Sequence, residues 1–282
     1  MPSRPRHVRH PFHHAIRRPR LIAAACTLAA ASLGLLAAAP AASAQSTAHY
    51  VALGDSYSSG VGAGNYSDGS CDQSSNAYPV LWSNANAPAS FANETCSGAT
   101  TSSVISSQLG ALNSGTTLVS ITVGGNDVGF SSVMETCVLE STSSCVSAVN
   151  NSENEVANQL PGELNSVLGD IKADAPNARV VVLDYPQLYD LSKSSTCIGL
   201  STTDRTALNQ GASEMDSAIQ AAAGRYGDVF ADVQNQFAGH QICDSSSWLH
   251  SVNFLDLSES YHPTASGQSS GYLPIFTAAA QG

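Results

Sequence analysis

Strand-length apolar segments alternate with longer segments of helical period along most of this 282-residue chain. The apolar segments are rich in β-branched residues and end at polar or glycine residues, as strands do. They are His49–Leu53, Leu118–Val123, Ala178–Leu183 and Val229–Val233. This alternation predicts a three-layer α/β/α domain, in which helices cover both faces of a mostly parallel central sheet.

Apolar residues between these strands recur at intervals of three and four, which is typical of amphipathic helices with one buried face. One series runs from Val156 to Ile171 and a second from Leu208 to Tyr226. Pro161 lies within the first series, where we expect it to kink or restart the helix. The serine-rich stretches 67–75 and 141–152 are predicted to be surface loops.

The N-terminal segment has the order of a secretory signal peptide. Six arginines and no acidic residue precede an apolar run from Leu21 to Ala39 and the tripeptide Ala42-Ser43-Ala44. A membrane anchor is the alternative, but the run is alanine-rich and ends in a small-residue cleavage site, so we expect cleavage after Ala44. The predicted mature protein is then a single extracellular domain, residues 45–282. The residues set aside with the signal peptide include Cys26, His7, His10, His13 and His14.

The charge of the chain excludes one class of function. Removal of residues 1–44 would leave five of the 11 Lys and Arg residues and all 22 acidic residues, a formal charge near -17. A nucleic-acid-binding protein needs a basic surface instead. With 43% hydrophobic residues and mean hydropathy near zero, the chain is neither a polytopic membrane protein nor a disordered one.

Six of the seven cysteines would remain after cleavage, an even number that predicts three disulfides in an oxidising compartment. Six cysteines allow 15 connectivities, and the sequence does not decide between them. Sequential pairing is our working choice. A zinc site is the alternative, but the chain has no CxxC pair.

A candidate nucleophile, Ser56, follows the first predicted strand in the run LGDSYSSG. Ligands bind at the carboxyl ends of the strands in such sheets, so Ser56 is well placed to face a substrate. The alternative is an ordinary Gly-Asp-Ser turn. The GxSxG pattern of another hydrolase class is broken at Ser58, and Gly60, Gly62 and Gly64 lack the spacing of a nucleotide-binding loop.

Candidate oxyanion donors follow in two further segments. Gly124 and Gly125 precede Asn126, and paired glycines let the backbone approach a substrate while the asparagine amide stays a neutral donor. The alternative is a glycine turn in which Asn126 caps the next helix. Gly98, in the run CSGAT, offers another backbone N–H close to Cys96.

A candidate general base, His262, stands in the run ESYHP. Of the four histidines that follow residue 44, it alone has both a nearby acidic residue and a proline that stiffens its turn. Histidine titrates in the range that suits a general base. The alternative is a histidine with a structural role only.

In this order, the segments GDSYSSG, CSGAT, GGNDVGF and YHPTASGQ resemble the four blocks of the SGNH or GDSL hydrolase family, over nearly all of residues 49–275. Within that family the chain is most similar to the secreted lipases, esterases and phospholipase A1 enzymes of streptomycetes. The resemblance implies a flavodoxin-like fold, a monomer, and no metal or other cofactor. It implies sequential disulfides, namely Cys71 with Cys96, Cys137 with Cys145 and Cys197 with Cys243.

The same resemblance implies the site. Ser56 would be the nucleophile and His262 the base, with the N–H groups of Ser56 and Gly98 and the Asn126 amide as oxyanion donors. Most members have an aspartate three residues before the histidine, where this chain has Glu259. Either Glu259 or the main-chain carbonyl of Ser260 would orient the imidazole, and we favour the carbonyl.

The implied activity is the hydrolysis of lipid acyl esters through an acyl-enzyme. The segment 128–134 after Asn126 would line an apolar acyl groove or, alternatively, form the core face of a helix. Two other functions remain open: a carbohydrate acetyl esterase with the same catalytic residues, and a non-catalytic secreted binding module, which the coincidence of four blocks disfavours. We expect no nucleic-acid partner and no stable insertion into membranes.

Overall fold

The computed structural model describes residues 47–281 except 194 and 254–255. All of them belong to one compact unit, Ser43–Gly282. The predicted signal peptide, residues 1–44, lies outside the described residues. No helix among the residues described is both long enough and apolar enough to cross a membrane.

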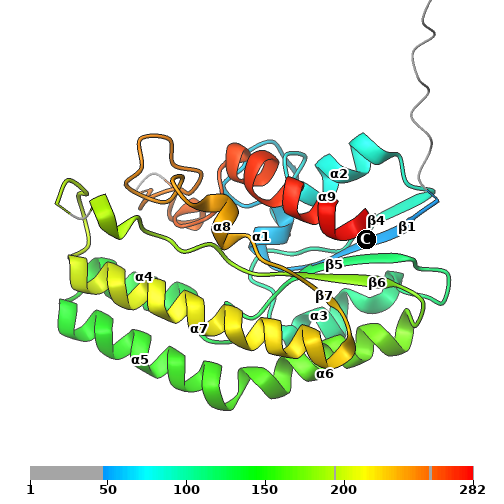
Figure 1. Cartoon of the computed structure of the whole chain (residues 1–282), viewed down its shortest axis with the longest axis horizontal. Coiled ribbons are helices and arrows are strands. Elements are labelled where there is room, and N and C mark those ends of the chain that lie inside the picture. Colours follow the sequence, from blue (N-terminus) through cyan, green and yellow to red (C-terminus); the bar gives the residue numbers. More distant parts are fainter. Residues whose placement is uncertain (1–46, 194, 254–255, 282) are drawn as a thin grey trace, which may run out of the picture. The chain divides into compact units, whose positions relative to one another are not determined.

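A five-stranded parallel sheet forms the centre of the unit, in the order β4-β1-β5-β6-β7 (Figure 1). Taken along the chain, its strands have the spatial order 2-1-3-4-5, which is the flavodoxin-like arrangement. The prediction of an α/β fold with a mostly parallel sheet is confirmed. The strands are β1 (His49–Gly54), β4 (Ser90–Asn93), β5 (Leu118–Thr122), β6 (Arg179–Leu183) and β7 (Val229–Ala231).

The four predicted strands lie where expected, to within two residues at each end, but the prediction missed β4. Its sequence, SFAN, has one large apolar residue, and it pairs with β1 alone at the edge of the sheet. Its residues are exposed or only partly buried. A short edge strand needs no continuous apolar run, so hydrophobic pattern does not reveal it.

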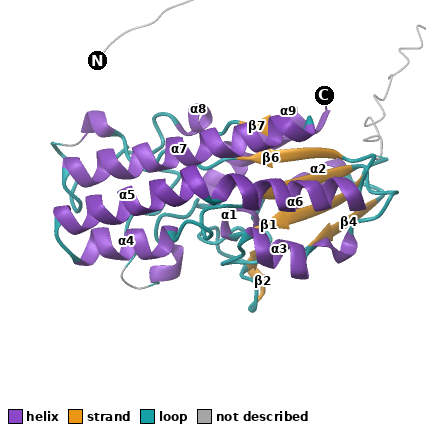
Figure 2. Cartoon of the chain, turned by 90° about the horizontal axis from the view of Figure 1, so that it is seen from below, coloured by secondary structure: helices purple, strands orange, loops and turns teal. Residues whose placement is uncertain are grey.

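Helices cover both faces of the sheet (Figures 1 and 2). Two of them, α2 (Tyr78–Asn86) and α9 (Leu273–Gln281), cover one face, while α3 (Thr101–Ser107), α6 (Leu160–Asp174) and α7 (Thr202–Tyr226) cover the other. Two more, α4 (Phe130–Leu139) and α5 (Thr142–Asn158), lie beyond the carboxyl ends of the strands, where α5 packs against α7 and α4 packs against α5 (Figure 2).

The remaining elements are short. A two-stranded antiparallel hairpin, β2 (Tyr66–Asp68) and β3 (Gln73–Ser74), contains most of the 67–75 stretch. The short helices are α1 (Ser56–Ser59) and α8 (Gln234–Phe237). A π-helical segment, Gly267–Tyr272, leads into α9. Single 3₁₀ turns occur at Leu109–Ala111, Leu191–Lys193 and Leu257–Glu259.

The prediction of a surface loop at 141–152 is wrong. This serine-rich stretch forms the N-cap and the first part of α5. Ser141 caps the helix by accepting a hydrogen bond from the Ser144 N–H at 3.2 Å. Cys145, Val149 and Val156 are its buried residues. This sparse apolar stripe is enough to hold a helix whose other faces are polar, which explains why composition alone misled the prediction.

The apolar series from Val156 to Ile171 spans two helices, because α5 ends at Asn158 and α6 restarts at Leu160. Pro161 lies in the first turn of α6, where its missing N–H has no helical acceptor to lose. The restart expected at this proline is therefore observed.

Candidate active site

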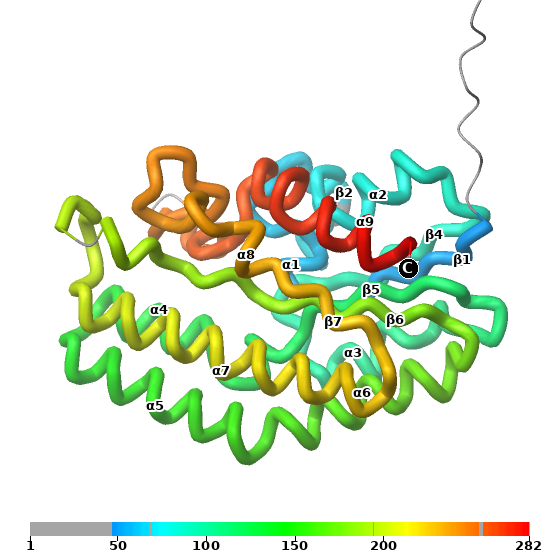
Figure 3. Tube along the Cα trace, in the orientation of Figure 1, coloured from blue at the N-terminus to red at the C-terminus, as the bar shows by residue number. Residues whose placement is uncertain are grey.

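The site lies where β1 and β5 end side by side, because the strand order reverses between them. Gly54, the last residue of β1, has φ +119°, and a Cβ there would lie 2.3 Å from the Thr122 carbonyl oxygen. Only glycine allows this approach. The Asp55 N–H then donates to the same Thr122 oxygen at 2.9 Å. This packing brings the chain that follows β1 next to the chain that follows β5 (Figure 3).

Ser56 is the first residue of α1 and is 8% exposed. The Asp55 carboxylate caps this helix by accepting from the Tyr57 N–H at 3.0 Å. The Ser56 carbonyl accepts from the Gly60 and Val61 N–H groups, each at 3.0 Å. Within the described residues, the Ser56 N–H itself has no acceptor. The backbone of Ser56 is thus held tightly, while its N–H stays available to a ligand.

His262 directs its ring at Ser56, with Nε2 2.7 Å from the serine Oγ. The other ring nitrogen, Nδ1, lies 3.1 Å from the Ser260 carbonyl oxygen. Because a carbonyl only accepts, Nδ1 carries the proton and Nε2 is the acceptor for the serine hydroxyl. Burial lowers the pKa of His262 to about 4. The imidazole is therefore neutral at pH 7, as a general base must be.

Glu259 faces away from the imidazole. Its carboxylate accepts from the Tyr66 hydroxyl at 2.8 Å, and that hydroxyl accepts in turn from the Gly62 N–H at 2.9 Å. The side chain of Glu259 thus contacts the β2–β3 hairpin, while the carbonyl of Ser260 contacts Nδ1 of His262. This geometry favours the carbonyl as the group that orients the base.

Asn126 does not cap the following helix, since the N-cap of α4 is Gly129. Its amide donates one hydrogen to the Ala99 carbonyl at 3.0 Å, and Asn126 lines the same cavity as Ser56. Among the residues that the structure describes, the other amide hydrogen has no acceptor, so it is available to a substrate. The glycine turn that was the alternative interpretation is present, but it presents the asparagine side chain instead of burying it in a cap.

Gly98 is exposed, in a left-handed conformation with φ +77°. Its N–H has no acceptor within the described residues. The structure does not place it in the wall of the cavity, but the bond from Asn126 to Ala99 links the two segments. A disulfide between Cys71 and Cys96 and a bond from the Cys96 N–H to the Gly54 carbonyl at 3.0 Å hold this loop beside β1.

An apolar cavity opens at Ser56 and Asn126 and extends between α4, α5 and α7. Most of its wall is aliphatic or aromatic. The apolar residues include Val128, Phe130, Val133, Val149, Val156, Leu188, Leu208, Ala212 and Met215. A disulfide between Cys137 of α4 and Cys145 of α5 joins two of the helices that form it.

The segment 128–134 both lines the apolar cavity and forms the core face of a helix, the two alternatives that the sequence left open. Val128, Phe130 and Val133 line the cavity beside Ser56, and Val133 and Met134 are buried in the core. Phe130 and Met134 also line a second groove, on the His262 side. The start of α4 is therefore both a core helix and a wall between two apolar surfaces that meet at the reacting groups.

Several buried polar groups that the sequence did not reveal hold the site together. The side chain of Gln108 brackets Gly54, accepting from its N–H at 2.7 Å and donating to its carbonyl at 3.0 Å. The Tyr57 hydroxyl donates to the Tyr261 carbonyl at 2.7 Å. The residue after the nucleophile thus binds the residue before the base, although 204 positions separate them. Only the position of Tyr57, next to Ser56, was a signal in the sequence.

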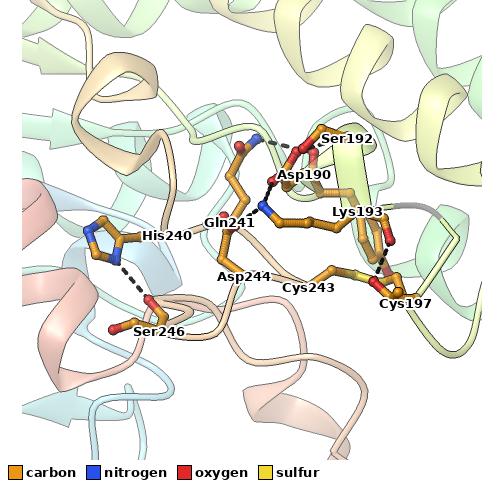
Figure 4. Close-up of polar contacts among 11 residues, drawn as sticks. Asp190, Ser192, Lys193, Cys197, His240, Gln241, Cys243, Asp244 and Ser246 are labelled. Carbon is orange, nitrogen blue, oxygen red and sulfur yellow. Dashed lines mark hydrogen bonds and ion pairs between the residues drawn. A yellow bond between two sulfur atoms is a disulfide. The ribbon is translucent and has the colours of Figure 1, made fainter.

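A polar cluster braces the loop that follows β6 (Figure 4). Lys193 lies between two carboxylates, with Nζ 3.1 Å from Asp190 and 3.6 Å from Asp244. Next to it, a disulfide joins Cys197 to Cys243. The chain runs on from this cluster to Leu249, which pairs with Pro263 beside the base. The brace therefore supports the segment that carries His262.

Comparison with known proteins agrees with this geometry. Residues 52–269 match the model of the GDSL-like lipase/acylhydrolase family. Lipase 1 of Streptomyces coelicolor is 51% identical over 270 residues, which cover 94% of this chain and 100% of that protein. The crystal structure of phospholipase A1 from Streptomyces albidoflavus superposes with a TM-score of 0.80 at 51% identity, covering 82% of this chain and 98% of that one.

A more distant structure shares the fold alone. An acetylxylan esterase from Geobacillus stearothermophilus, solved as a catalytic mutant, superposes with a TM-score of 0.53 at 13% identity. The match covers 86% of this chain and 97% of that one.

Proposed function

Because the chain belongs to the GDSL-like lipase/acylhydrolase family, we propose that it is a secreted, monomeric hydrolase that cleaves the acyl esters of lipids through a Ser56 acyl-enzyme. The contact between His262 Nε2 and Ser56 Oγ carries the proposal, because a neutral imidazole 2.7 Å from a serine hydroxyl is positioned to remove its proton. Three disulfides support folding in an oxidising compartment.

The reaction proceeds in two steps. His262 removes the proton of Ser56 as Oγ attacks the ester carbonyl, and the protonated imidazole then donates that proton to the leaving alcohol. Water, activated by the same nitrogen, releases the acid and restores the serine. The Ser260 carbonyl accepts from Nδ1–H throughout, and so holds the tautomer that each step requires. The Ser56 and Gly98 N–H groups and the Asn126 amide stabilise the tetrahedral oxyanion.

The apolar cavity supports a long acyl chain as the preferred acyl group. An acetyl group would fill only the part of the cavity nearest Ser56, while a fatty acyl chain buries its methylenes along the wall between α5 and α7. Each buried methylene stabilises the bound state by about 0.8 kcal/mol. A phospholipid or a glyceride therefore fits the site better than an acetylated polysaccharide does. A chain this acidic favours neutral or zwitterionic lipids over anionic ones.

A substrate panel tests this proposal. We expect hydrolysis of phosphatidylcholine and triglyceride, measured as fatty acid released from each position. We also expect kcat/KM for p-nitrophenyl decanoate to exceed that for the acetate by at least about tenfold. Preferred release of acetate from acetylated xylan would instead establish a carbohydrate esterase. Loss of all hydrolysis in Ser56→Ala is the control for a contaminating enzyme.

A substitution in the cavity wall makes the same test specific to the structure. Ala212→Leu, in α7, fills part of the cavity, so it should lower kcat/KM for the decanoate while leaving that for the acetate within about twofold. Ser217→Leu, at an exposed position of the same helix, is the matched control and should change neither.

A further inference from the structure

A buried tyrosine hydroxyl lies between the two loops that carry the reacting groups. The Tyr185 hydroxyl donates to the Asp55 carboxylate at 2.5 Å and accepts from the Gly125 N–H at 3.2 Å. Asp55 immediately precedes Ser56, and Gly125 immediately precedes Asn126. A single oxygen atom thus joins the neighbour of the nucleophile to the neighbour of the oxyanion asparagine.

Both ends of this link are rigid. The second carboxylate oxygen of Asp55 caps α1 through the Tyr57 N–H, so a shift of Asp55 would move Ser56 with it. Gly125 has no side chain, and a Cβ there would lie 3.5 Å from the tyrosine hydroxyl. The phenol therefore packs directly against the backbone of the oxyanion segment.

Tyr185 is itself held in place by contacts of its backbone and its ring. Tyr185 follows β6 by two residues, and its N–H donates to the Asp216 carboxylate of α7 at 3.2 Å. Its ring meets the Tyr57 ring edge-on, with centroids 4.9 Å apart. Tyr185 is 5% exposed, so its backbone, its ring and its hydroxyl are all fixed.

We propose that Tyr185 is a positioning residue, which sets the separation between the Ser56 nucleophile and the Asn126 amide by joining Asp55 to the Gly125 N–H. This inference rests on the proposed function of Ser56 and Asn126. A misplacement of about 1 Å between reacting groups can slow an enzyme by about 10²-fold, so a link of this kind has a measurable effect on turnover.

The protonation of the pair is consistent with this role. Burial raises the pKa of Tyr185 far above its ordinary value, so the phenol remains a donor at neutral pH. Burial raises the pKa of Asp55 to about 7, and the bonds from Tyr185 and Tyr57 act against that rise. Loss of the hydroxyl would leave a buried carboxylate oxygen and a buried N–H without this partner.

The first test is Tyr185→Phe, which keeps the ring in the cavity wall and removes the link. We expect kcat to fall about 10- to 100-fold while KM stays within about twofold, because the substrate still contacts the same ring. Tyr50→Phe is the matched control, since it removes an equally buried hydroxyl bond, to Ser120 at 2.7 Å, away from the site. It should lower the melting temperature by a similar amount and leave kcat unchanged.

The second test separates positioning from stability by a double-mutant cycle. If Tyr185 acts through the Asn126 segment, Tyr185→Phe should slow the Asn126→Ala variant clearly less than it slows the native enzyme. The inference would be overturned if Tyr185→Phe left kcat unchanged, or if Tyr50→Phe lowered kcat as much as Tyr185→Phe does. It would also be overturned if the kcat of the double variant fell by the full product of the two single-variant factors. Full activity in Ser56→Ala or Asn126→Ala would instead overturn the proposed function, whatever Tyr185→Phe does.

Discussion

Replacing His262 with alanine is expected to lower kcat by a factor on the order of 10⁴ to 10⁶, because nothing else in the described site can accept the Ser56 proton. His262 Nε2 is the acceptor 2.7 Å from Oγ, and His250 turns its Nε2 to the Gly62 carbonyl at 2.8 Å. Turnover of a soluble p-nitrophenyl ester, with the melting temperature measured in parallel, gives the result free of any effect on lipid binding.

Glu259→Gln is the matched control for that experiment. The Glu259 carboxylate bonds to Tyr66, while the Ser260 carbonyl orients the imidazole, so this variant should keep kcat within about threefold of the native value. A loss in Glu259→Gln comparable to that in His262→Ala would replace the dyad by a Ser-His-Glu triad. Retention of activity in His262→Ala would remove His262 from the mechanism.

The second large effect is expected at Asn126. Asn126→Ala removes an oxyanion donor, which costs about 3 to 4 kcal/mol of transition-state stabilisation and should lower kcat by about 10² to 10³ with little change in KM. Asn126→Asp has nearly the same shape but presents a carboxylate that cannot donate and that repels the developing oxyanion. We therefore expect it to lose at least as much.

Steady-state kinetics with the decanoate ester checks both variants. A rise in KM at unchanged kcat would mean that Asn126 binds the ground state only, and an unchanged kcat/KM would exclude it from the oxyanion hole. An active Asn126→Asp variant would contradict the role of the amide as a donor.

Much of the sheet could be predicted because the sequence of a strand that is buried on both faces is a nearly continuous apolar run. The segments that became β1, β5 and β6 are almost fully buried and have this property. The two edge strands, β4 and β7, are mostly only partly buried, and of these only β7 could be predicted, from the apolar residues of the run Val229–Val233. The prediction at 141–152 failed because α5 buries only one narrow face, while its other faces are rich in serine and asparagine. The amino-acid composition of such a helix reflects its exposed faces, and only the spacing of its few apolar residues indicates the buried face.

The candidate site followed from motifs at strand ends, where Ser56 and Asn126 lie side by side because the strands are parallel neighbours. The supporting groups could not be predicted in this way. Tyr185 and Gln108 act through hydrogen bonds to Asp55 and Gly54, which lie 130 and 54 positions away, and no local pattern encodes a contact of that range. The nearest signal was that Tyr185 closely follows a predicted strand, at the same edge of the sheet as Ser56.

The central claim is that Ser56 is the nucleophile of an acyl-transfer enzyme. Incubation of the native protein with a serine-directed phosphonate, followed by intact-mass measurement and peptide mapping, tests it most directly. We predict that one phosphonate group is incorporated, on the peptide that contains Ser56, that activity is lost in parallel, and that Ser56→Ala takes up none. Absence of labelling in the active native protein, or equal labelling of Ser56→Ala, would contradict the claim.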